Sequence, residues 1–503
     1  MNQLSGKPIS FWIESTPTPH FEPLSQNIPV DVAIVGGGIA GLSAAFKLKQ
    51  AGKTVAVIEA RRLASTASGH TTAKITSLHQ LIYAQLIAAQ GEQKAKMYAD
   101  SNQAAITQIA AWVEQEQIDC DFQWKSAYTF TESELNLEQI TGEVEAAVRL
   151  GLPATFVTEV SLPFPIAGAI KFENQAQFHV RKYLLHLANK IAGNGSHVFE
   201  STRVKTVERG TPCEVITDQG TILAQDVIVT TNLPILDQGL FFAKAYPKRS
   251  YLVAAKINPS QAPDGMFISI DDPYRSIRTT PWGEDLLLFI GGEGHKVGSE
   301  SHPEDRYQAL ETYGRERFGI ERFDYRWSSQ DVKSFDHLPY IGPLTPLDQH
   351  IFVATGFSLW GMTHGTLSGM ILSDRILGND NPWASLYDST RATPFLSQTS
   401  LKENLDVGKH WIGDRLKGLN QSSFEDIKPG EGKILTLGGQ KVAASRDKTG
   451  AVHTVSAVCS HLGCIVNWNS AEKSWDCPCH GARFSGSGQV LNGPAVQPLQ
   501  TES

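Results

Sequence analysis

The chain lacks any basic stretch that could neutralise the phosphates of a nucleic acid. Its 503 residues carry 44 Lys and Arg against 52 Asp and Glu, for a net charge of −8. Binding to nucleic acid depends on clustered Lys and Arg, so we expect no nucleic-acid partner. Apolar residues make up 41% and charged residues 19% of the chain. These values are typical of a globular protein, and the length allows two or three domains.

Two kinds of segment that direct a protein to or across a membrane are also missing. No run of apolar residues approaches the roughly 18 that a membrane span requires. The first residues, MNQLSGKPISFWIE, show no basic region followed by an apolar core and a cleavage site, as a secretory signal would. We therefore expect no membrane span and a cytoplasmic location.

Cysteine is scarce, and its distribution is informative. Of six cysteines, Cys120 and Cys213 stand alone and are expected to be small buried hydrophobic residues. The other four lie near the C-terminus, where Cys459-Ser460-His461 is followed after fifteen residues by Cys477-Pro478-Cys479-His480. Two Cys and two His at this spacing can ligate a Rieske [2Fe–2S] cluster, in which two thiolates hold one iron and two imidazoles hold the other.

A tetrahedral zinc site is the alternative, because two Cys and two His also form a zinc ligand set. Zinc would leave a second pair, Cys464 and Cys479, without a role, so we favour the cluster. The predicted metal ligands are Cys459 and Cys477 for one iron and His461 and His480 for the other.

The run CSHLGC…CPCHGARF, completed by Gly493-Pro494-Ala495, resembles the Rieske proteins of the cytochrome bc type. This resemblance implies a disulfide between Cys464 and Cys479 that clamps the two cluster loops, a pair that Rieske ring-hydroxylating oxygenases lack. In high-potential members a Ser and a Tyr after the second His ligand donate hydroxyls to cluster sulfurs. Here those positions are Ala482 and Phe484. Neither side chain can donate, so we expect a potential toward the lower part of the Rieske range.

A second motif lies near the N-terminus. The apolar stretch Asp31–Val35 leads into Gly36-Gly37-Gly38-Ile39-Ala40-Gly41, then a helical stretch, then Thr54–Ile58 and Glu59. This order of strand, Gly-rich turn, helix, strand and acid is the fingerprint of dinucleotide binding. The glycines allow a tight turn and close approach to a pyrophosphate at a helix N-terminus. Glu59 would accept a hydrogen bond from a ribose hydroxyl, which disfavours NADP, while FAD and NAD both fit.

Other segments favour FAD. The residues Asp336–Pro343, the strand Ile351–Thr355 and the turn Gly356–Gly365 resemble the C-terminal flavin-binding segment of the D-amino-acid oxidase and glycine oxidase family. Ser68–Thr72 and Val227–Asn232 match as well, and the resemblance covers roughly residues 8 to 385. The cofactor-binding residues that it implies are Gly36, Gly38, Gly41, Glu59, Ser68, Thr71, Thr72, Val204, Asn232, Gly356, Gly361, Met362 and Thr363.

The predicted fold is an α/β, Rossmann-like FAD-binding domain with an inserted α+β substrate domain, followed by a small all-β Rieske domain. We expect the oxidoreductase domain over residues 1–395, a linker helix over 396–424 and the Rieske domain over 425–503. The expected nucleotide-binding parts are about 28–80, 195–235 and 335–385, and the substrate-domain parts are about 85–190 and 240–333. A second glycine run, Gly291–Gly294, is interpreted as part of a substrate-domain strand because no packed helix follows it.

A flavin accepts an electron pair, whereas a Rieske cluster carries one electron, so the two together would convert pairs into single electrons. We expect a flavin-dependent oxidoreductase that oxidises a C–N bond of an amine or amino acid. The cluster would pass the electrons to an external acceptor, for example a small redox protein. The alternative is a redox relay between carriers without a small-molecule substrate, although some 150 residues between the flavin motifs favour a substrate domain.

The substrate is inferred from a departure from the family. Members that act on amino acids often hold the carboxylate with an Arg or Lys just after the flavin-binding Gly, where this chain has Thr363. The absence of this Arg or Lys favours amines as substrates, as in oxidases that resemble the γ-glutamylputrescine enzyme. The candidate substrate-pocket residues are Tyr251, Arg278, His295, Thr363 and His364.

Overall fold

The computed structural model describes residues 4–17, 19–299, 302–392 and 423–501. Within them an eight-stranded sheet has the order β16-β17-β10-β1-β2-β7, with β9 on β10 and β8 on β9. The strands from β17 to β7 pair in parallel, whereas β16 pairs antiparallel to β17. Its strands are β1 (Ile28–Val35), β2 (Val55–Ile58), β7 (His197–Phe199), β8 (Val204–Glu208), β9 (Cys213–Thr217), β10 (Thr221–Val229), β16 (Tyr340–Pro343) and β17 (Ile351–Thr355).

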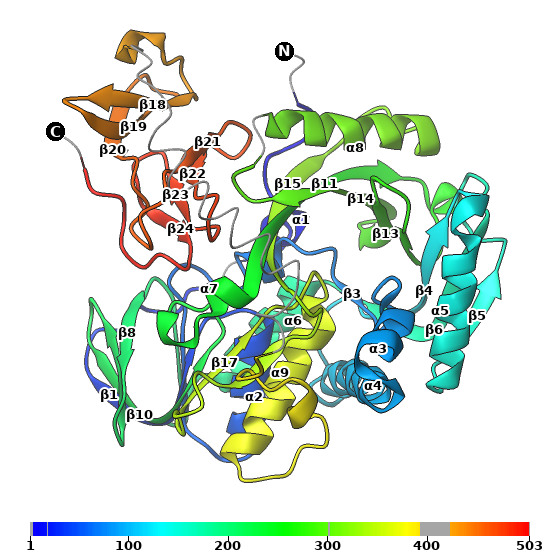
Figure 1. Ribbon diagram of the computed structural model, residues 1–503, viewed down its shortest axis with the longest axis horizontal. Coiled ribbons are helices and arrows are strands. Elements are labelled where there is room, and N and C mark those ends of the chain that lie inside the picture. The colour runs from blue at the N-terminus through cyan, green and yellow to red at the C-terminus, as the bar shows by residue number, and fades with distance from the viewer. Residues whose placement is uncertain (1–3, 18, 300–301, 393–422, 502–503) are drawn as a thin grey trace.

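The Gly-rich turn joins β1 to α2 (Ile39–Gln50), as the sequence predicts. Gly36 has a φ of +115°, a left-handed conformation that a Cβ disfavours. A Cβ on Gly41 would lie 2.0 Å from the Gly36 carbonyl oxygen, so α2 can approach β1 only because residue 41 has no side chain. α2 packs against α9 (Gly361–Ile376) and α6 (Val180–Ile191), and Figure 1 shows the three helices grouped beside the sheet.

A second, nine-stranded sheet has the order β15-β11-β14-β13-β12-β4-β6-β3, with β5 on β6, within the described residues. The Gly291–Gly294 run lies within β14, as expected. The strands are β3 (Lys74–Ile75), β4 (Gln123–Thr131), β5 (Ala154–Val157), β6 (Gly168–Gln177), β11 (Ala245–Ile257), β12 (Met266–Ser269), β13 (Arg275–Trp282), β14 (Asp285–Lys296) and β15 (Tyr325–Ser334).

Helices accompany this second sheet. α8 (Pro303–Phe318) packs on β11 and β14, and α5 (Leu137–Arg149) packs on β5 and β6. α3 (Ile82–Gln90) and α4 (Glu92–Gln115) lie between α5 and α9 (Figure 1). Two short helices in the described part of the chain are α1 (Phe11–Glu14) and α7 (Phe241–Lys244). One apolar core joins residues of both sheets, such as Ile34 and Phe289.

The C-terminal residues form two small antiparallel sheets, β18-β19-β20 and β21-β22-β23-β24. Figure 1 shows them, in orange and red, above β8, β10 and α7 and beside β11 and β15. Their strands are β18 (Gly432–Leu437), β19 (Gln440–Arg446), β20 (Val452–Ser456), β21 (Asn467–Asn469), β22 (Ser474–Asp476), β23 (Arg483–Ser485) and β24 (Val490–Asn492).

These sheets confirm the predicted fold class: a Rossmann-like part, an α+β part inserted in it and an all-β C-terminal part. The expected linker helix lies almost wholly outside the described residues, and the domain boundaries stay a prediction. No helix in the described part of the chain is long and apolar enough to cross a bilayer.

Candidate functional site

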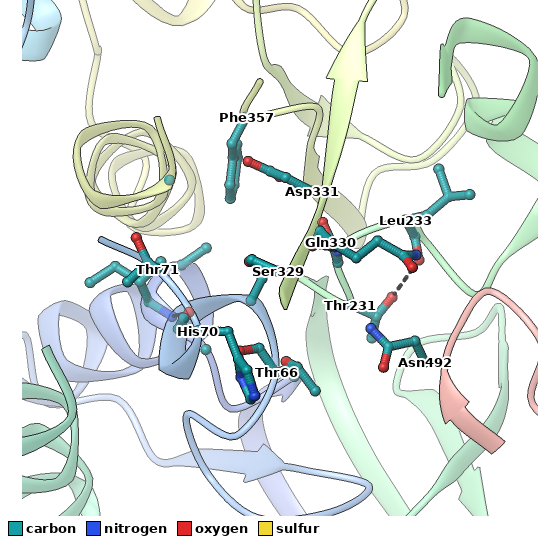
Figure 2. A pocket seen from close by; sticks show the side chains of 18 of the residues that line it. Thr66, His70, Thr71, Thr231, Leu233, Ser329, Gln330, Asp331, Phe357 and Asn492 are labelled. Atoms are coloured by element: carbon teal, nitrogen blue, oxygen red, sulfur yellow. Dashed lines mark hydrogen bonds between the residues drawn. The ribbon is translucent and has the colours of Figure 1, made fainter. Parts of the chain in front are cut away.

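A large pocket lies where the parallel strands of the first sheet end. Its walls come from the Gly-rich turn, the end of β2, residues 66–72, the end of β10, β15 and the turn before α9. Figure 2 shows Thr71 and His70 on one side of it, Ser329, Gln330 and Asp331 on β15, and Phe357 beyond. Ligands of parallel α/β sheets bind beyond the carboxyl ends of the strands, so the position agrees with a dinucleotide site.

The turn at the start of α2 has the features that a pyrophosphate requires. Gly38, the N-cap of α2, has no side-chain cap hydrogen bond, and a Cβ there would lie 3.0 Å from the Ser68 hydroxyl. Ser68 Oγ accepts from the N–H of Ile39 at 3.0 Å, which ties residues 66–72 to the helix start. A bare backbone at a helix N-terminus is suited to an anion.

Glu59 closes one end of this turn. Its carboxylate accepts from the backbone N–H groups of Gly37 and Arg61, both at 2.9 Å. Burial raises the pKa of Glu59, and these two hydrogen bonds oppose that rise. The residue lines the pocket, where a carboxylate oxygen can accept from a ribose hydroxyl.

Most residues predicted to bind the cofactor line this pocket: Gly36, Gly38, Glu59, Ser68, Thr71, Thr72, Val204, Asn232, Gly361 and Met362. Gly41 instead packs against Gly36. Gly356, with a φ of +77°, lies against the Tyr340 ring. Thr363 is 1% exposed, and its hydroxyl lies 3.2 Å from His79 Nε2 rather than at the pocket wall. The individual roles of these residues stay predictions.

The candidate substrate residues separate in space. Tyr251 lines the pocket, and its hydroxyl lies 2.9 Å from Nε2 of His295. Arg278 is buried behind the wall, where it donates to the carbonyl oxygens of Thr72 and Ala73 at 2.9 and 2.8 Å. His364 lies inside the helix packing, with Nε2 3.1 Å from the Tyr98 hydroxyl. Arg278 and His364 thus support the wall instead of facing the cavity.

Sequence reasoning missed Lys74, which lines the pocket on the side of the second sheet. Its Nζ donates to the carbonyl oxygen of Phe267 at 2.5 Å and to Ser276 Oγ at 2.8 Å. Burial lowers the pKa of Lys74 well below its ordinary value, and the Arg278 charge adds to this effect. Lys74 lies in β3, directly after the Ser68–Thr72 segment, and belongs to no recognisable motif. Only the tertiary structure therefore identifies it as a pocket residue.

Asp331 was missed as well. Its carboxylate accepts from the N–H of Val332 at 2.7 Å and of Leu359 at 2.5 Å, and burial raises its pKa to about 6. Ser358 and Leu359 have φ of +53° and +76°, so this carboxylate fixes a left-handed turn at the start of α9.

The C-terminal domain brings its predicted ligands together. Cys459 and Cys477 are both free and buried, and the His461 and His480 rings lie 5.1 Å apart. Nδ1 of each imidazole is buried without a hydrogen-bond partner in the described part of the chain. Two free thiols and two unpartnered imidazole nitrogens are the donor set of a Rieske cluster, so the residues fit this group. The predicted disulfide between Cys464 and Cys479 is confirmed.

The outer edges of both imidazoles lie against the oxidoreductase part of the chain. His461 Nε2 lies 2.9 Å from Asp237 Oδ1, and the His461 side chain is 5% exposed. The His480 ring packs edge-on against Phe242 at 5.2 Å. The segment from Asp237 to Phe242 therefore covers the imidazole side of the cluster site.

Comparisons with known proteins agree with both sites. The chain matches the family model described as FAD dependent oxidoreductase (DAO) over residues 31–375 and the model described as Rieske [2Fe-2S] domain over residues 421–502. YhfW of Bacillus subtilis (strain 168), a Rieske 2Fe-2S iron-sulfur protein by name, is 38% identical over 98% of this chain and 97% of its own.

Two further relatives match the N-terminal part. Gamma-glutamylputrescine oxidoreductase of Escherichia coli (strain K12) is 24% identical over 71% of this chain and 86% of its own. The solved structure of glycine oxidase from Geobacillus kaustophilus shares the fold, with 20% identity and a TM-score of 0.62 over 72% of this chain and 99% of its own. The chain belongs to the DAO family of FAD-dependent oxidoreductases and carries a Rieske [2Fe–2S] domain in its C-terminal part.

Proposed function

We propose that this protein oxidises the C–N bond of an amine or amino acid and delivers the electrons, one at a time, to an external acceptor. When bound, FAD accepts a hydride and the Rieske cluster carries single electrons. The observation that carries the proposal is the cover over the cluster site. His461 bonds to Asp237 and His480 packs on Phe242, so the imidazole edges face the oxidoreductase part of the same chain.

The reaction balances as follows. The substrate C–H bond next to nitrogen breaks with its electron pair, the nitrogen releases a proton, and a C=N bond forms. For each imine formed, two electrons reduce two molecules of a one-electron acceptor, and two protons are released, one from the nitrogen and one from the transferred hydride. A small redox protein is a suitable acceptor class.

The second sheet supplies the substrate end of the pocket in this proposal. Tyr251, Tyr274 and Ser276 line it together with Lys74. Burial lowers the pKa of Lys74, which favours its Nζ as the group that accepts the proton that an alkylammonium substrate must lose before oxidation. A lysine whose pKa is lowered is a weaker cation for a carboxylate than an Arg, and residue 363 is a Thr, which together support amines over α-amino acids.

Anaerobic mixing with a panel of amines and α-amino acids tests the proposal. Bleaching of the flavin absorbance by one substrate class, followed by reduction of the cluster, is the expected result. Bleaching only by a reduced electron carrier would identify a redox relay instead. Preference for α-amino acids at micromolar concentrations would overturn the preference for amines, because another cation would then have to hold the carboxylate.

A further inference from the structure

The wall of the flavin pocket is not made by the flavin-binding part alone. Residues 491–493, 495 and 496, in and just after β24 of the Rieske domain, line the same cavity as Gly38 and Glu59. Figure 2 shows Asn492 beside Thr231, on the side of the pocket opposite Thr71. More than 250 residues of sequence separate Asn492 from Thr231, so only folding brings them together.

Two arginines tie this segment to the pocket. Arg61 donates through Nη1 to the carbonyl oxygen of Leu491 at 3.2 Å, and Arg203 donates through Nη2 to that of Val490 at 3.1 Å. Both arginines line the pocket, and both act electrostatically on Glu59. The Rieske segment is therefore anchored at the end of the pocket that holds the predicted ribose-binding carboxylate.

The same segment also borders the cluster site. Ala495 is 2% exposed and belongs to the apolar core that contains Cys459 and Cys477, yet it lines the flavin pocket as well. A single stretch of chain thus separates the two cofactor sites.

Buried polar contacts hold the Rieske domain in this position. Arg249 pairs with Asp476 at 3.0 Å, and these side chains are 1% and 3% exposed. Gln330, a pocket residue, donates through Nε2 to the Gly481 carbonyl oxygen at 2.8 Å, next to the ligand His480. A domain that swung away would break both of these contacts across the interface.

We propose that the Rieske domain is a fixed wall of the FAD pocket, and that tight retention of FAD requires the segment from Val490 to Val496. This inference concerns cofactor binding and goes beyond the proposed reaction. Its tests use no substrate, so its failure and a failure of the proposed function are distinguishable.

Asn492→Trp in the full-length holoprotein tests the wall, because the larger side chain enters the cavity. The matched control is Val452→Trp, which places the same side chain at a position on β20 that is 37% exposed. We expect Asn492→Trp to weaken FAD retention on dilution by at least about tenfold, while the control retains FAD like the wild type. The paramagnetic resonance signal of the cluster reports that the Rieske domain stays folded. Equal FAD retention in both variants would overturn the proposal.

Hydrogen exchange in the wild type tests, without any substitution, whether the Rieske segment is part of the FAD site. Peptides covering 488–499 should exchange more slowly in the FAD-loaded protein than in protein stripped of FAD, whereas peptides covering β19 and β20 should not change. If FAD protects only peptides before residue 392, the Rieske domain is not part of the site and the proposal fails.

Discussion

The guanidinium of Arg249 on β11 and the carboxylate of Asp476 on β22 form an ion pair of 3.0 Å, although 227 residues separate them in sequence. Arg249 also donates to Ser328 Oγ at 2.9 Å, and Arg483 binds the second oxygen of Asp476 at 3.2 Å. The Arg249 charge and the Arg483 charge lower the pKa of Asp476 against the effect of burial. The charged network therefore lies inside the interface between the second sheet of the oxidoreductase part and the Rieske domain.

Arg249→Met should loosen this interface. Removing one partner of a buried pair costs about 3–5 kcal/mol, and we expect the lower end because Arg483 still pairs with Asp476. Urea unfolding, followed by flavin fluorescence and by the circular dichroism of the cluster, should change from one coincident transition to two. Arg149→Met is the control: it breaks a pair with Glu92 in which the two side chains are 54% and 57% exposed, so its effect should stay below about 1 kcal/mol. Equal effects of the two substitutions would contradict the fixed interface.

Gly38→Val should remove FAD. The new Cβ would lie 3.0 Å from Ser68 Oγ, and its methyl groups would occupy the space through which the backbone approaches a pyrophosphate. We expect FAD affinity to fall by at least about tenfold, measured by flavin absorbance after gel filtration, with the cluster signal retained. Gly142→Val is the control, because a Cβ there meets no atom within 4 Å. Full retention of FAD by Gly38→Val would show that the turn does not bind the pyrophosphate.

Cys459→Ser should abolish the paramagnetic signal of the cluster and leave yellow protein whose FAD the substrate still reduces. Cys459 does not line the flavin pocket, and the Cys464–Cys479 disulfide still joins the two cluster loops. Turnover with the physiological acceptor should be lost. If this variant also loses FAD, the disulfide alone does not hold the segment from Val490 to Val496 at the FAD pocket.

Ala482→Ser and Phe484→Tyr should each raise the midpoint potential of the cluster. Both residues are fully buried in the apolar core that contains Cys459 and Cys477, and neither donates a hydrogen bond. A donor to a cluster sulfur stabilises the reduced, more negative state. The wild-type midpoint should lie toward the lower part of the roughly −150 to +300 mV range of such clusters. Redox titration of the three proteins measures these midpoint potentials. If neither variant shifts the midpoint, the missing donors do not set the potential of the cluster.

Glu143 should make the stability of the folded protein depend on pH, and it does so away from both cofactor sites. Its carboxylate is fully buried and accepts from the N–H groups of Tyr83 and Ala84 at 2.7 and 2.8 Å. Burial raises its pKa from 4.5 to about 7. The folded state therefore holds the proton more tightly, so this contribution to stability is present below pH 4.5 and is lost as the pH rises through 7.

Glu143→Gln should remove that dependence. Relative to the wild type, the variant should gain stability between pH 5 and pH 8, by at most roughly 3 kcal/mol. Melting temperatures of both proteins at pH 5, 6, 7 and 8 measure the difference. Parallel curves across this range would show that the Glu143 carboxyl keeps an ordinary pKa.

The sequence by itself determined the features that depend on spacing within a short stretch. The cluster motif around Cys459 and Cys477 and the turn from Gly36 to Gly41 are each encoded in fewer than thirty consecutive residues. The geometry of the cluster ligands and the backbone conformation of the turn are local requirements. The residues of each motif must therefore stand at fixed distances from one another along the chain. The disulfide between Cys464 and Cys479 followed from the same local resemblance.

Only the tertiary structure decided which distant residues share a wall. Lys74, Gln330 and Asn492 line one pocket although no motif joins them, and Thr363, placed by its spacing after Gly361, is buried against His79 instead. The cover that Asp237 forms over His461 likewise appears only when the domains are in contact. Such contacts depend on how whole sheets pack and on the pairing of buried charges. Neither requires the residues to be a fixed distance apart in the sequence.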